Sequence, residues 1–88
     1  MIAAVVLIDA EPGQVGGLAQ QLVEIDGVAE AYSVTGHHDL VAVVRVRAHE
    51  DLADVVTGGI AKLPGIRDTT TLVAFRQYRA EDWAWDIS

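Results

Sequence analysis

Apolar positions along the chain group into four runs of strand length, separated by segments with a helical period. Each run is rich in β-branched or aromatic residues and is too short for a helix, which is typical of buried or half-buried strands. The predicted strands cover residues 2–8, 28–35, 40–47 and 69–78. A short polar loop at residues 36–39 joins the second and third strands, so these two are expected to form a hairpin.

Two amphipathic helices are predicted between the strands. In the first, apolar residues recur at steps of three and four over residues 15–25, after an acidic, proline-containing start, and Asp26-Gly27 ends the pattern. The second opens at Glu50 and Asp51, carries its apolar residues on one stripe as far as Leu63, and ends at Pro64-Gly65.

The resulting order is βαββαβ, and the two halves resemble each other at a spacing of 38 residues; for example, Leu18, Leu22 and Ile25 precede Val56, Ile60 and Leu63 by that spacing. Right-handed crossovers combine two strand–helix–strand units into one sheet. We therefore predict an α+β, ferredoxin-like fold: a four-stranded antiparallel sheet with both helices on one face.

The strands carry more apolar residues than one covered face requires. Residues 2–8 are apolar at both alternating sets of positions, and residues 40–44 are apolar throughout. A bare face of this kind would exceed the apolar area that monomers usually expose, so we predict a homodimer with sheets packed face to face. The alternative is that small residues such as Ala3 and Ala42 dilute the exposed face enough to leave a monomer.

Composition and charge narrow the classes of function. The 88 residues include 13 Asp and Glu against 6 Lys and Arg, a net charge of −7, which argues against direct nucleic-acid binding because phosphates require a basic face. There is no cysteine for disulfides or thiol chemistry, and the longest apolar run is too short to span a bilayer. These features predict a cytoplasmic protein without membrane contact.

Candidate metal and catalytic residues are few. His37, His38 and Asp39 are adjacent, and His49 follows ten residues later, but adjacent histidines on a tight loop rarely share one metal ion. A polar hairpin loop explains these residues better. The chain has no nucleophile at a spacing typical of a catalytic site, and it has no glycine-rich phosphate loop. We therefore predict no catalytic residue, no metal and no cofactor.

Two segments at strand ends could bind a small zwitterion. Residues 35–40 and 64–71 both combine backbone amides and hydroxyls with a carboxylate. A carboxylate can bind an ammonium group, while amides and hydroxyls can bind a carboxyl group. The alternative is that Gly36 and Asp39 only shape a turn and that the threonines only favour a strand.

These two segments, on this scaffold, resemble the effector-binding domain of the Lrp/AsnC family, also called the RAM domain. The family pattern contains G-V, then V-T-G-x-x-D-L, and later P-G-V-x-x-T-x-T. This chain has Gly27-Val28, then Val34-Thr35-Gly36-His37-His38-Asp39-Leu40, then Pro64-Gly65-Ile66 with Thr69 and Thr71. The resemblance covers residues 2–79, so we predict a RAM-like ligand-binding domain over residues 1–79.

The resemblance implies a dimeric α+β barrel, further association into rings, often of four dimers, and small effectors, usually amino acids, bound between dimers. Asp39 would accept the ammonium group of the effector, Gly36 would offer its backbone, and Thr69 and Thr71 would hold the carboxylate. The predicted ligand-binding residues are Gly36, His37, His38, Asp39, Thr69 and Thr71. The two histidines occupy positions that vary in the family.

Family regulators also carry an N-terminal helix-turn-helix domain, whereas this chain begins at its first predicted strand. We therefore expect it to resemble the stand-alone members and to act without contacting DNA, with helix-turn-helix-bearing relatives as candidate partners. The tail at residues 80–88 contains Trp83 and Trp85, which would either dock at an oligomer interface or cap the domain's own sheet edge.

The leading hypothesis is a non-enzymatic, oligomeric module that binds an amino acid. Dimeric α+β barrels of this topology also serve as cofactor-free monooxygenases, so a small enzyme is one alternative. The other alternative is a purely structural assembly partner. The predicted helices face the sheet with Val, Leu and Ile, which favours packing over a catalytic cavity.

Overall fold

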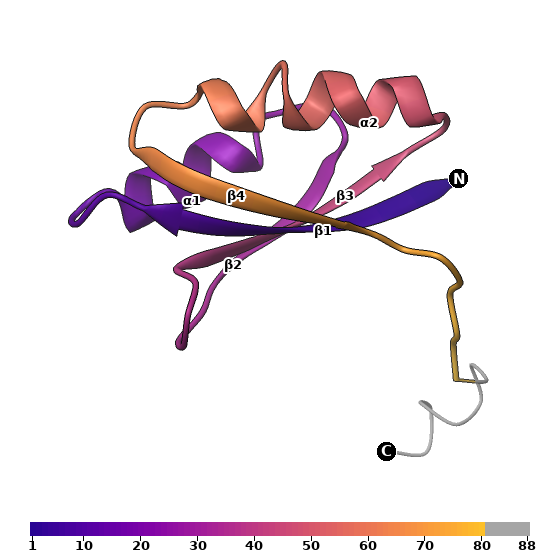
Figure 1. Ribbon diagram of the computed structural model, residues 1–88, viewed down its shortest axis with the longest axis horizontal. Helices are drawn as coiled ribbons and strands as arrows, with labels where there is room; N and C mark the ends of the chain where they lie inside the picture. The colour runs from indigo at the N-terminus through magenta and orange to yellow at the C-terminus, as the bar shows by residue number, and fades with distance from the viewer. Residues whose placement is uncertain (81–88) are drawn as a thin grey trace.

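The computed structural model describes residues 1–80, and these residues fold in the predicted βαββαβ order. Figure 1 shows the elements along the chain. They are β1 (Ile2–Ala10), α1 (Val15–Leu22), β2 (Val28–Ser33), β3 (Leu40–Val46), α2 (His49–Val56), the 3-10 turn η1 (Ile60–Lys62) and β4 (Ile66–Val73). Trp83 and Trp85, and the predicted docking of the tail, lie outside the described residues.

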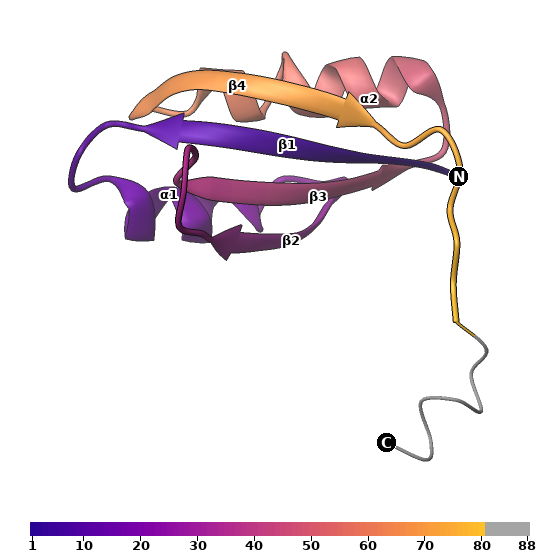
Figure 2. The same ribbon diagram turned by 60° about the horizontal axis from the view of Figure 1, so that its bottom comes forward.

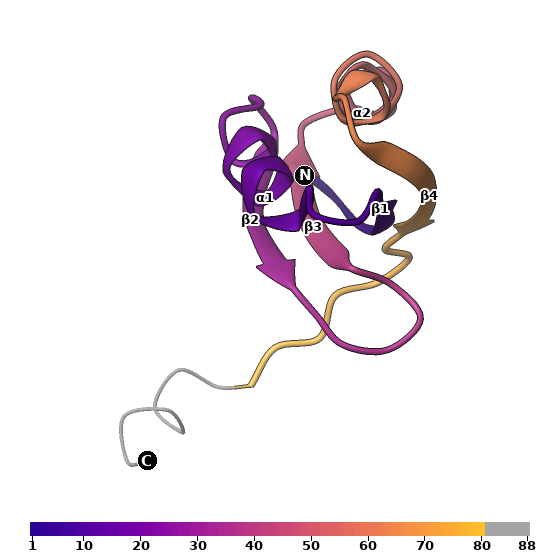
Figure 3. The same ribbon diagram turned by 90° about the vertical axis from the view of Figure 1, so that its left-hand side faces the viewer.

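The four strands form one antiparallel sheet in the order β2-β3-β1-β4, which confirms the predicted ferredoxin-like fold. Both helices lie on the same side of this sheet (Figures 1 and 3). The hairpin of β2 and β3 forms as expected and places its connecting loop beside the C-terminal end of β1 (Figure 2), where Asp39 N–H donates a 2.9 Å hydrogen bond to Ile8 O.

The core lies between the sheet and the helices. One set of alternating residues on β1 and β3 is fully buried there, together with Leu18 and Leu22 from α1 and Ile60 from η1. The strand members of this set are Ala4, Val6, Ile8, Leu40, Ala42 and Val44. This is the helix-covered half of the pattern that the apolar runs predicted.

The opposite side of the sheet, which we call the open face, carries two cross-strand rows that are mostly apolar. In the first row Val5 lies between Val43 and Leu72, and in the second Leu7 lies between Val41 and Thr70. At the β2 edge these rows end in Glu30 and Tyr32. Tyr32 and Leu72 are about half exposed, at 49% and 52%. The surplus of apolar residues therefore lies on a face that no helix of the described chain covers.

The helices are shorter than their apolar stripes predicted. The first ends at Leu22, because the following residues form tighter turns in which Ile25 N–H donates to Leu22 O at 3.1 Å. The second ends at Val56, before Gly58-Gly59, and resumes as the short turn η1. Two consecutive glycines favour such a break, since each weakens a helix by about 1 kcal/mol relative to alanine.

The last strand begins and ends earlier than the predicted residues 69–78. It runs from Ile66 to Val73. Just beyond its end, Ala74 N–H donates a 2.8 Å hydrogen bond to Ala3 O of β1. The last pair of the register is Val73 with Ala4, and every described residue from Ala74 onward is exposed. Among the described residues, no helix is long and apolar enough to cross a membrane.

Candidate functional site

Asp39 anchors the loop between β2 and β3 to the end of β1. Its side-chain Oδ2 accepts a 2.8 Å hydrogen bond from Ala10 N–H, and its backbone N–H donates to Ile8 O at 2.9 Å. Its own carbonyl accepts a hydrogen bond from Val34 N–H at 3.0 Å. One carboxylate oxygen is thus used structurally, while Oδ1 has no hydrogen-bond partner among the described residues.

A second contact joins the same loop to β1. His38 Nδ1 lies 2.9 Å from Asp9 Oδ1, and both side chains are about one-third exposed. Asp9 is the open-face neighbour of Ile8, and Ile8 pairs with Leu40, so the β1–β3 register places Asp9 next to Asp39. Two carboxylates therefore lie at the junction of the loop and β1.

A cavity of about 390 Å³ opens beside this junction. We call it the loop cavity, and its lining residues are Asp9, His37, Asp39, Arg67 and Asp68. The last two come from the start of β4, so three separate segments of the chain contribute. Three carboxylates and one guanidinium give the cavity an excess of negative charge together with one fixed positive group. Arg67 Nε also lies 3.9 Å from Glu11 Oε1, a long and exposed ion pair that leaves the guanidinium available.

The structure brings part of the predicted ligand set together. His37 and Asp39 line the loop cavity, and His38 contacts its wall through Asp9. Gly36 lies in the same loop with φ of +119°, a conformation that side chains other than glycine rarely adopt. The residue is exposed, so its role as a turn former and its predicted role as a backbone ligand are compatible.

The threonine pair lies elsewhere. Thr69 and Thr71 pair with Ile8 and Val6, whose side chains are buried beneath the helices. Directly opposed residues of a sheet share a face, so both threonines belong to the helix side of β4, and neither lines the loop cavity. Their role in holding a carboxylate stays a prediction from the family resemblance.

Three cavity residues were absent from the predicted ligand set. Asp9 belongs to the acidic start of the first predicted helix. Arg67 and Asp68 lie inside segment 64–71 but were not among its predicted ligand residues. The pairing of Asp9 with Asp68 across β1 and β4 is what assembles them. The sequence signal that could have found them is the ferredoxin-like topology itself, because its first strand lies between the third and fourth and so ends between the two segments.

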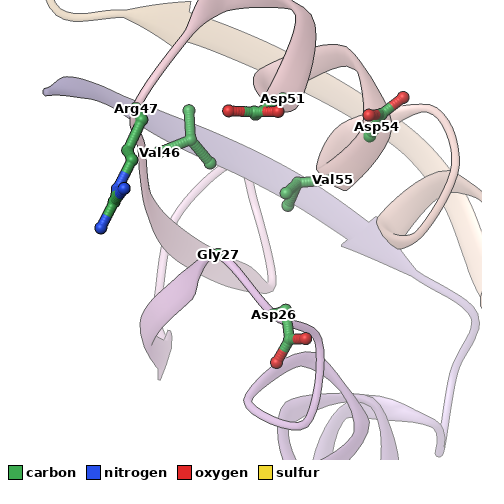
Figure 4. Close-up of a pocket in the computed structure, with 7 residues that line it drawn as sticks. All are labelled: Asp26, Gly27, Val46, Arg47, Asp51, Asp54 and Val55. Atoms are coloured by element: carbon green, nitrogen blue, oxygen red, sulfur yellow. The ribbon is translucent and has the colours of Figure 1, made fainter.

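A second cavity of about 290 Å³ lies at the opposite end of the sheet (Figure 4). Val46 and Val55 form its apolar floor beside Gly27, and its charged lining residues are Asp26, Arg47, Asp51 and Asp54. In Figure 4 the charged ends of these side chains point in different directions rather than toward a common point. A small-molecule site needs convergent polar groups, so this cavity is the weaker candidate.

Residues 1–80 contain no cluster of three His, Asp or Glu side chains arranged to hold a metal ion. The metal hypothesis needed either Asp39 or His49 to join His37 and His38. His49 opens α2, and Asp39 Oδ2 accepts the hydrogen bond from Ala10 N–H.

Comparison with known proteins assigns this fold and loop to a family. A family model described as the Lrp/AsnC ligand binding domain matches residues 3–84. The chain belongs to this family. As an Lrp/AsnC ligand binding domain, it is a regulatory effector-binding module, and its family and relatives are transcription regulators rather than enzymes. This confirms the predicted RAM-like identity and the prediction of a non-enzymatic chain.

Individual similar proteins support the same family assignment. The crystal structure of TTHA0845 from Thermus thermophilus is 50% identical, with a TM-score of 0.86 over 91% of this chain and 100% of that one. The regulator LrpA of Pyrococcus horikoshii is 36% identical over 59 residues, which are 67% of this chain and 42% of that protein. This chain thus spans about half the length of the curated regulators it matches.

One solved relative contains an amino acid. The feast or famine regulatory protein of M. tuberculosis, whose structure is a complex with L-methionine, is 25% identical to this chain, with a TM-score of 0.76. That match covers 93% of this chain and 55% of the mycobacterial protein.

Proposed function

We propose that this Lrp/AsnC domain binds a free amino acid in the loop cavity and transmits binding through assembly. The observation that carries the proposal is the charge arrangement of the cavity: three carboxylates and one guanidinium from three chain segments. A zwitterion presents one ammonium and one carboxylate, and its two ends require the two kinds of group found there. The methionine complex of a relative supports an amino acid as the ligand class.

The groups divide naturally between the two ends of the ligand. Asp39 Oδ1, free of the hydrogen bond that occupies Oδ2, is available to accept the ammonium group, with Asp9 adding negative charge. Arg67 can pair with the ligand carboxylate, a role in which the planar guanidinium makes two parallel hydrogen bonds. Gly36 and His37 are proposed to complete the site from the loop between β2 and β3.

The loop cavity of a single chain is too exposed to bind tightly. His37, Arg67 and Asp68 are all exposed, whereas small-molecule sites typically bury about 70–90% of their ligand. A neighbouring chain placed over the cavity would close it. Binding would then be coupled to oligomeric state, because a ligand stabilises the assembly that binds it better.

The assembly unit is proposed to be a dimer formed through the open face. Val5, Leu7, Val41 and Val43 form a continuous apolar strip along the two central strands. At its margin the Tyr32 hydroxyl donates a hydrogen bond to the Glu30 carboxylate; this bond and the carboxylate's charge raise the pKa of Tyr32 and keep the phenol neutral. Sheet-to-sheet packing would bury the strip, and further association of dimers into rings would close the loop cavities.

Regulation is proposed to reach DNA through helix-turn-helix-bearing relatives. Residues 1–73 carry ten acidic and four basic side chains, a net charge of −6, which repels phosphate. Fluorescence anisotropy with duplex DNA at low salt should show no binding by this chain. Binding at micromolar concentration would contradict this part of the proposal.

Isothermal titration calorimetry tests the ligand assignment, with methionine first and then the other amino acids. Asp39→Asn removes the charge while keeping an oxygen that can accept the Ala10 N–H. We expect it to weaken binding at least tenfold, because the ammonium group loses its ionic partner. The matched control is Asp54→Asn, which removes a carboxylate from the other cavity and should leave affinity unchanged.

Two results would contradict the proposal. If the wild-type chain binds none of the amino acids, the ligand class is wrong, and an oligomer with no ligand would support a purely structural partner. If Asp39→Asn binds as tightly as the wild type, the ligand lies elsewhere.

A further inference from the structure

Residues 74–80, which we call the arm, follow β4 and lie outside the sheet. Every residue of the arm is exposed, including two aromatic side chains, Phe75 at 98% and Tyr78 at 83%. The exposed stretch continues from Leu72 and Val73, each about half exposed, at the end of the strand. Exposed aromatic side chains in an extended segment are the kind of group that buries a large apolar area on docking.

The direction of the arm points to the open face. In Figures 1 and 3 the two helices lie on one side of the sheet and the arm leaves toward the other side. Two sheets packed face to face are about 10 Å apart, whereas seven extended residues reach about 23 Å at about 3.3 Å per residue. The arm is therefore long enough to pass a second sheet placed on the open face and to lie along its flank.

The origin of the arm favours a second copy of this chain as the occupant. The exposed stretch begins at Leu72, which pairs with Val5 in the first apolar row of the open face. The arm is therefore continuous with the face on which the second copy is proposed to pack, and its aromatic side chains extend that apolar surface beyond the sheet.

We infer that the arm of each chain docks on the flank of a second copy, with Phe75 and Tyr78 as its apolar anchors. The arms clasp the two open faces together from the side where β4 ends. This inference rests on the proposed face-to-face dimer and adds to it a second contact that exchanges segments between the copies.

Dimer dissociation measured by sedimentation velocity on dilution of the full chain tests the clasp. Phe75→Ser combined with Tyr78→Ser should raise the dimer Kd at least tenfold, which corresponds to about 1.4 kcal/mol. Both side chains are exposed within the chain, so the fold should be retained, and circular dichroism checks this. Val23→Ser is the matched control: it removes a 53% exposed apolar side chain next to α1 and should leave Kd unchanged.

A photo-crosslinking amino acid at position 75 provides a second readout. In a mixture of two tagged forms of the chain, the clasp predicts a crosslinked product that contains both tags. Products confined to one chain would overturn the inference.

The proposed dimer and the clasp fail in different ways. A serine double variant with the wild-type Kd overturns the clasp alone if Val43→Glu on the open face still abolishes the dimer. A wild-type chain that is monomeric, or a Val43→Glu variant that stays dimeric, overturns the proposed interface and the clasp with it.

Discussion

At Gly27 the backbone has φ of +99°, and a Cβ atom there would lie 2.6 Å from Val55 Cγ2 and 3.2 Å from Val46 Cγ1. The turn from α1 into β2 therefore requires glycine for two reasons: the backbone conformation and the close approach of α2. Gly17 has neither constraint, since it lies inside α1 with nothing within 4 Å of an added Cβ.

These two glycines should respond to alanine in opposite directions. Gly27→Ala is expected to lower the free energy of unfolding by about 1–3 kcal/mol through strain and displacement of Val55. Gly17→Ala should raise it by up to about 1 kcal/mol, because alanine favours the helix. Urea denaturation of both variants measures the difference. A Gly27→Ala chain as stable as the wild type would show that the turn adapts without cost.

At the scale of elements, side chains as well as strand pairing hold the loop between β2 and β3 against the sheet. Asp39 and His38 each reach across to the end of β1, where they contact Ala10 N–H and Asp9. The loop is thereby positioned beside the ends of β1 and β4, and the proposed ligand site depends on this arrangement.

The rate of hydrogen exchange at the Ala10 amide should measure how firmly Asp39 holds the loop against β1. Asp39→Ala leaves the part-buried Ala10 N–H without its acceptor, at a cost of about 1–3 kcal/mol, so we expect faster exchange and a lower melting temperature. Asp39→Asn, which keeps an acceptor oxygen, should exchange much closer to the wild-type rate. Equal exchange in the alanine variant and the wild type would mean that the hydrogen bond does not hold the loop.

At the scale of the whole molecule, only one of the two sides of the sheet is covered by helices of residues 1–80. The rows centred on Val5 and Leu7 leave the other side apolar. The amount of apolar surface, rather than any single residue, is the reason to expect a partner.

Val43→Glu should convert the proposed dimer to a monomer, because face-to-face packing would bury the new carboxylate without a partner. Size-exclusion chromatography with light scattering measures the mass. Val23→Glu, at an exposed apolar position next to α1, is the matched control and should keep the wild-type mass. An unchanged mass for Val43→Glu would place the interface elsewhere.

Much of the fold was predictable because its periodicities are local. The alternating runs and the glycine-marked turns give the βαββαβ order, and the predicted hairpin and helix-covered face are both present. Element ends were less predictable. The break after Val56, for example, depends on a glycine pair inside an otherwise continuous apolar stripe.

The amino-acid sequence by itself determined the order of elements, the covered face and the family, because local period and short motifs encode them. Only the tertiary structure decided the composition of the loop cavity. Strand register brought Asp9 and Asp68 beside Asp39, and the same register put Thr69 and Thr71 on the helix side. Successive residues of a strand face opposite sides of the sheet. The spacing of a motif therefore identifies its residues, whereas the pairing of the strands determines which side chains lie in the same cavity.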